Sequence, residues 1–74
     1  MLRLKEVSSR NDIDVLDRNE QIIYLSFKAS NSDIFRLLHN CPKISAIQFP
    51  TSYRKGLSKA VEMLLAMQGI ELIE

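Results

Sequence analysis

Apolar and polar residues alternate at the start of the chain and then change to a helical spacing. Residues 2–7 alternate leucines with cationic side chains, the period-two pattern that predicts a strand. Residues 9–17 then place Ile13 and Leu16 three positions apart. Ser9 precedes them, and aspartates stand at positions 12 and 14. This arrangement predicts a short helix from about Ser9 to Asp17, with an irregular turn as the alternative.

The middle of the chain predicts a strand followed by a capped helix. Residues 21–27 are a nearly continuous run of β-branched and aromatic side chains, typical of a strand covered on both faces in a parallel sheet. Ser30 and Asp33 have the spacing of a capping box, which predicts a helix from Ser30 to Asn40. Its apolar positions follow helical spacing, at Ile34, Leu37, Leu38 and Cys41.

The last third of the chain predicts a strand, a long helix and a final strand. Residues 44–49 are mostly apolar, and Pro50 ends the run. We expect one helix from Thr51 or Ser52 to Gln68, with Gly69 as its left-handed cap. Residues 70–73 then form a short strand.

Together these elements predict a small α/β fold, β-α-β-α-β-α-β, with a mainly parallel four-stranded sheet. The whole of residues 1–74 is expected to form one domain. Three helices would have to cover two faces of the sheet. The alternative is a short solenoid resembling leucine-rich repeats, in which all helices lie on one side.

Composition limits how such a short chain can be stabilised. Cys41 is the single cysteine and His39 the single histidine, so neither an internal disulfide nor a structural zinc site is possible. We expect self-association to supply part of the missing stability. The lone cysteine, the charged N-terminus and the lack of a long apolar run indicate a cytoplasmic protein, away from membranes.

The most plausible ligand site is the edge of the sheet where the strands end, because helix N-termini there favour anions. Three turns rich in hydroxyl and cationic side chains reach this edge. The predicted anion- or phosphate-binding residues are Ser9, Arg10, Lys28, Ser30, Ser32, Thr51, Ser52, Arg54 and Lys55. No glycine-rich phosphate loop accompanies them.

No group of residues has the pattern of a catalytic or metal centre. His39 and Cys41 are two positions apart, and Cys41 continues the apolar stripe of its helix, so we expect it to be buried. The aspartates at positions 12, 14 and 17 do not converge as metal ligands do. We therefore predict no catalytic residue, metal or cofactor.

The function that fits best is a small non-enzymatic binding or regulatory protein that self-associates and binds a phosphate-bearing or acidic partner. One alternative is an enzyme or accessory subunit that acts on a phosphorylated small molecule. Another is a weak nucleic-acid binder, although the net charge of only +1 gives it little support.

Several segments spread over nearly the whole chain resemble one family. The resemblance is carried by Val7-Ser8-Ser9-Arg10, by residues 27–35, by Asn40-Cys41-Pro42-Lys43, by Pro50-Thr51-Ser52-Tyr53 and by Met67-Gln68-Gly69-Ile70. The family is a small archaeal one, found mainly in methanogens, whose function is unknown. This resemblance implies an archaeal, cytoplasmic protein, and family members usually extend beyond the position of Glu74.

Overall fold

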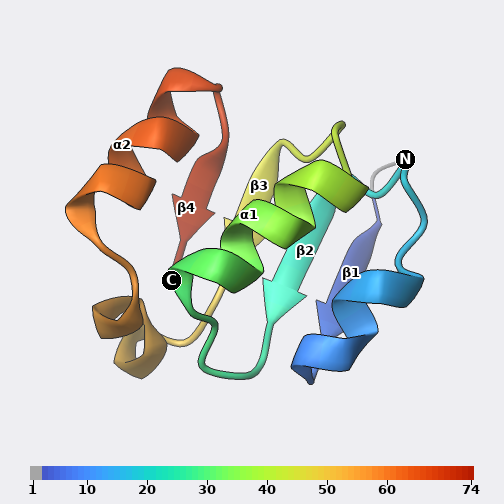
Figure 1. Ribbon diagram of the computed structural model, residues 1–74, viewed down its shortest axis with the longest axis horizontal. Coiled ribbons are helices and arrows are strands. Elements are labelled where there is room, and N and C mark those ends of the chain that lie inside the picture. Colours follow the sequence, from blue (N-terminus) through green and yellow to red (C-terminus); the bar gives the residue numbers. More distant parts are fainter. Residues whose placement is uncertain (1–2) are drawn as a thin grey trace.

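A four-stranded parallel sheet forms the centre of the computed structural model, which describes residues 3–74 apart from the side chains at positions 54 and 55. Its strands lie side by side in chain order (Figure 1). They are β1 (Leu4–Val7), β2 (Ile22–Leu25), β3 (Ala46–Gln48) and β4 (Glu71–Ile73). The prediction of an α/β fold with a parallel sheet is confirmed. The predicted start of the first strand, Leu2, lies outside the described residues.

Two of the predicted helices differ from expectation. The first predicted helix is a 3-10 helix, η1 (Arg10–Val15). The middle helix, α1 (Asn31–Asn40), lies close to its predicted bounds. The predicted helix over residues 51–68 is wrong as a single element. It divides into a 3-10 helix, η2 (Thr51–Gly56), and α2 (Lys59–Met67). Within residues 3–74, no helix has the length and apolar content needed to cross a membrane.

One long-range contact and one local hydrogen bond accompany the break between η2 and α2. A Cβ atom at Gly56 would lie 3.2 Å from the carbonyl oxygen of Ala29, so the absence of a side chain permits this close approach. The hydroxyl of Ser58 accepts a hydrogen bond from the Val61 amide at 3.2 Å and starts α2 as its N-cap. Gly69 then ends α2 with a φ of 77°, as its position predicted.

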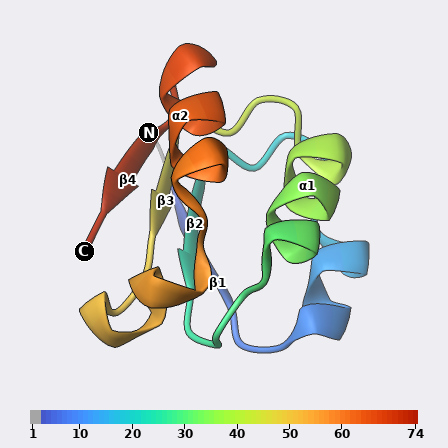
Figure 2. The same cartoon turned by 60° about the vertical axis from the view of Figure 1, so that its left-hand side comes forward.

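The helices that cover the sheet, η1, α1 and α2, all lie on one side of it, and η2 lies beyond its carboxyl edge (Figures 1 and 2). Each connection leads to the next strand in the same direction across the sheet. Because connections between parallel strands are right-handed, each helix then falls on the same face. The expectation that three helices share the two faces is therefore wrong, and the helix placement agrees with that of the solenoid alternative.

The hydrophobic core occupies the space between the sheet and the helices. Ile23 of β2 and Ile47 of β3 are neighbours in register, and both are fully buried. Leu37 of α1 and Leu65 of α2 are also fully buried and belong to the same cluster. The free energy of folding thus comes chiefly from one face of the sheet.

The opposite side of the sheet carries side chains without a covering layer. Strand alternation assigns to it two aligned rows, which we call the open face: Leu4, Ile22, Ala46 and Glu71, then Glu6, Tyr24, Gln48 and Ile73. Leu4 is 55% exposed, and Ile22, Tyr24 and Ile73 are half-buried. The prediction that residues 21–27 are covered on both faces is therefore wrong.

Two adjacent isoleucines provide a test of this one-sided core. Ile23→Val should lower the free energy of unfolding by about 0.5–1.5 kcal/mol, because Ile23 is fully buried. Ile22→Val, on the open face, should change it by less than about 0.5 kcal/mol. Urea unfolding followed by circular dichroism measures both. Equal losses would show that the open face is covered within the folded chain.

Candidate functional site

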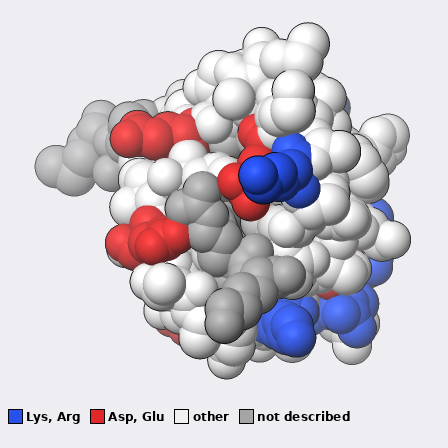
Figure 3. All heavy atoms as spheres, turned by 90° about the vertical axis from the view of Figure 1, so that its left-hand side faces the viewer, with Lys and Arg blue, Asp and Glu red and all other residues white. Residues whose placement is uncertain are grey.

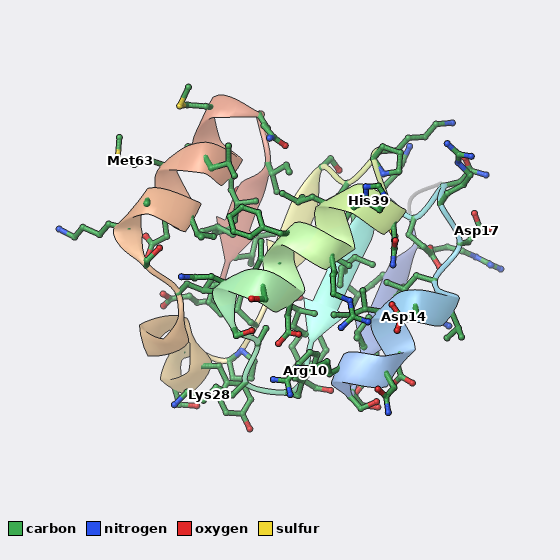
Figure 4. The ribbon with its side chains drawn as sticks, in the orientation of Figure 1. Arg10, Asp14, Asp17, Lys28, His39 and Met63 are labelled. Carbon is green, nitrogen blue, oxygen red and sulfur yellow. The ribbon has the colours of Figure 1, made fainter. Side chains whose placement is uncertain are left out.

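The loops that follow β1, β2 and β3 meet at the carboxyl edge of the sheet, as predicted. Figure 4 places Arg10 and Lys28 along this edge, while Asp17 and His39 lie at the opposite end. Seven of the predicted anion-binding residues come from these loops or from the helix starts beside them: Ser9, Arg10, Lys28, Ser30, Ser32, Thr51 and Ser52. The side chains of Arg54 and Lys55, the remaining predicted cations, lie outside the described residues.

Two of these residues, Arg10 and Ser30, form one hydrogen-bonded cluster around Asp33, which is only 2% exposed. Arg10 Nε donates to Asp33 Oδ1 at 2.8 Å. The Ser30 amide and hydroxyl donate to Asp33 Oδ2 at 2.9 and 3.1 Å. The Asp33 amide in turn donates to Ser30 Oγ at 3.3 Å, which completes a capping box at the start of α1.

The electrostatics of this cluster favour the ionised form of Asp33. Burial by itself would raise the pKa of Asp33, but the hydrogen bonds from Arg10 and Ser30 and the positive charge of Arg10 hold it below its usual value. The same hydrogen bond and the Asp33 charge raise the pKa of Arg10. Asp33 is thus a carboxylate at neutral pH, placed against the positive end of the α1 dipole.

The Asp33 carboxylate takes the place that was predicted for an external anion. Asp33 already occupies the position at the α1 N-terminus where an external anion would gain most, and it uses donors of Arg10 and Ser30. Thr51 Oγ1 donates to Glu74 at 3.4 Å. Among the described residues, every buried side-chain nitrogen and oxygen has a partner. No buried side-chain nitrogen or oxygen of the described residues is therefore left without a partner to receive a phosphate.

Sequence reasoning included Arg10 and Ser30 in the site but did not identify Asp33 as their anion. The spacing of Ser30 and Asp33 was the local signal for the capping box. Arg10 lies 23 residues before Asp33, so only the folded chain brings these two side chains together.

A small apolar hollow lies at the same edge. It is lined by Leu25, Phe27, Ala29, Phe49, Tyr53 and Leu57. It has room for about one water-sized group, which is far below the volume of a typical small-molecule pocket. The hollow could accept a methyl group from a partner, but it is too small to enclose a metabolite.

The remaining candidates for chemistry are not arranged for catalysis. Cys41 is fully buried, as expected, and its thiol donates to the Asp17 carbonyl at 3.4 Å. Burial, with the nearby charges of Glu20 and Asp17, raises the pKa of this thiol, which opposes formation of a nucleophilic thiolate. His39 is exposed. In the part of the chain that the structure describes, no three His, Cys, Asp or Glu side chains could hold a metal ion.

Comparison with known proteins identifies one family. The family model described as the N-terminal domain of a family of unknown function, DUF1699, matches residues 3–74. No curated protein and no solved structure matches the chain.

Two nearby serines test the energetic importance of the capping box. Ser30→Ala should lower the free energy of unfolding by about 1–2 kcal/mol, because it removes an acceptor for the Asp33 amide and a donor to the carboxylate. Ser32→Ala, at an exposed position in the same turn, should stay within about 0.5 kcal/mol of the wild type. Urea unfolding at neutral pH compares them. Similar effects of the two substitutions would contradict this assignment.

The lowered pKa of Asp33 gives its contribution a defined pH dependence. Its stabilising effect is fully present above the pKa of the unfolded chain, near 3.8, and is lost as the pH falls through the lower pKa of the folded state. The stability difference between the wild type and Asp33→Asn should therefore shrink as the pH falls below about 4. Urea unfolding between neutral and acidic pH measures it. A difference that grows with acidification would contradict the sign.

Proposed function

We propose that this chain, which belongs to the DUF1699 family of unknown function, is a non-enzymatic interaction domain that binds another polypeptide across the open face of its sheet. The observation that carries the proposal is the placement of the helices on one side. Parallel sheets normally have both faces covered, because their central strands are apolar on both sides. A partner would supply the second covering layer.

The composition of the open face supports this role. Three strands present larger apolar side chains: β1 has Leu4, β2 has Ile22 and Tyr24, and β4 has Ile73. The remaining strand, β3, contributes Ala46 and Gln48. Burying such surface against a partner is favourable by roughly 25 cal/mol per Å². A contiguous apolar surface is a stronger indication of an interface than scattered exposed residues.

Among the side chains that the structure describes, nothing comparable supports an enzyme or a phosphate-binding protein. The hollow at the carboxyl edge holds about one water-sized group, and Cys41 is buried. Arg10 is paired with Asp33, and Arg36 is paired with Asp14. We therefore assign the function to the open face rather than to the predicted anion-binding edge.

A second copy of the chain is expected to bind the open face only weakly. The strands contain three or four residues. Four such strands present roughly 200 Å² of sheet. A stable interface usually buries about 800 Å² from each partner. Self-association through this face is therefore expected at millimolar rather than nanomolar concentrations.

Methyl NMR of isoleucine side chains tests the proposal directly. As the protein concentration rises to about 1 mM, the methyl signals of Ile22 and Ile73 should shift, because weak contacts form on the open face. Those of Ile23 and Ile47, on the helix side, should stay constant. Tyr24→Lys should suppress the shifts by placing a charge in the centre of the open face.

Met63→Lys is the matched control, because Met63 is 65% exposed on α2 and points away from the rest of the molecule (Figure 4). It should leave the Ile22 and Ile73 shifts unchanged. If Met63→Lys rather than Tyr24→Lys removes these shifts, the open face is not the interaction surface. Signals that are independent of concentration would exclude self-association through this face.

A further inference from the structure

We infer that the occupant of the open face is an amphipathic helix of a partner protein, with Lys or Arg on both sides of its apolar stripe. This inference rests on the proposed function and specifies the partner. It is drawn from the charges of the open face, the spacing of the strands and the layer that already covers the other face.

The charged groups of the open face have one sign. Its eight positions include Glu6 and Glu71, both exposed, and no lysine or arginine. Ser26 Oγ donates to Glu6 Oε2 at 2.9 Å, which orients this carboxylate beside the face. Figure 3 looks onto the side formed by β4 and α2. Acidic atoms lie toward the left of this view, and basic atoms lie at its centre and lower right.

The two glutamates lie on opposite outer strands. Glu6 belongs to β1 and Glu71 to β4, while the central strands contribute Ile22, Tyr24 and Ala46. The open face therefore has an uncharged centre and an acidic group on each side. A partner that matches it has an apolar centre and a basic group on each side.

A second copy of this chain lacks that complement. Two open faces packed together would bring four carboxylates to one interface, with no cation from the same faces. The small contact area gives little hydrophobic free energy to offset their desolvation. The match in charge therefore favours a basic partner over a second copy.

A helix has the width that this arrangement needs. An α-helix is about 10 Å across, which corresponds to about two strand spacings of 4.8 Å. Laid over β2 and β3, its apolar stripe would contact Ile22 and Tyr24. Its flanks would then lie above β1 and β4, within reach of Glu6 and Glu71. A helical layer also covers the other face of this sheet.

Two synthetic peptides of about 14 residues provide the probes. Both carry the same leucine stripe, and one has lysine on its flanks whereas the other has glutamate. Titration into the full chain, followed by the isoleucine methyl signals, identifies the bound face and gives the dissociation constant.

The lysine peptide is expected to shift the Ile22 and Ile73 methyl signals without shifting those of Ile23 and Ile47, and to bind at least about tenfold more tightly than the glutamate peptide. The double variant Glu6→Gln/Glu71→Gln should weaken its binding about three- to tenfold. The matched control Asp12→Asn/Asp17→Asn removes two charges outside the open face and should leave the dissociation constant within about twofold.

Other results would overturn the inference in distinguishable ways. Equal binding of both peptides, or an equal effect of the two double variants, would remove the requirement for basic flanks. If neither peptide moves Ile22 or Ile73 while rising protein concentration does, the helix is not the occupant and the proposed function stands. If neither peptides nor concentration move these signals, both the inference and the proposed function fail.

Discussion

The handedness of the connections between parallel strands is the constraint on which this structure depends. The strands lie in chain order, so every connection moves across the sheet in the same direction. With one preferred hand, every helix must then lie on the same face. The hydrophobic core is built between that face and the helices, and the other face keeps apolar residues in contact with solvent. The interaction surface is thus a direct consequence of strand order.

At the carboxyl edge, the positive groups are neutralised by a side chain of the same protein, whereas hydroxyl-rich loops usually indicate a bound anion. Helix N-termini and basic side chains attract an anion, and here the chain supplies its own. The Asp33 carboxylate is buried at the start of α1 and receives hydrogen bonds from Arg10 and Ser30. It joins the loop after β1 to the helix after β2. The same residue types can therefore stabilise a fold or bind a ligand, depending on whether an internal acid reaches them.

Local signals in the sequence were reliable where they involve only a few neighbouring residues. The capping box of Ser30 and Asp33, the left-handed Gly69 and the burial of Cys41 all agree with the structure. The division of the last helix was missed because the apolar stripe continues through it. Gly56 and Ser58 are the residues that could have indicated this division. The close approach of Gly56 to Ala29, however, exists only after folding.

The sequence by itself determined the four strands and the helical segments that alternate with them, since hydrophobic periodicity and capping depend on contacts within one or two turns of chain. It also determined that the sheet is parallel, because strands separated by helices cannot pair as hairpins. Only the tertiary structure decided which strands are neighbours, which face is covered and that Arg10 meets Asp33. These features depend on contacts between residues 18 or more positions apart, as between Leu4 and Ile22 or Arg10 and Asp33, and no local pattern in one sequence specifies such pairs.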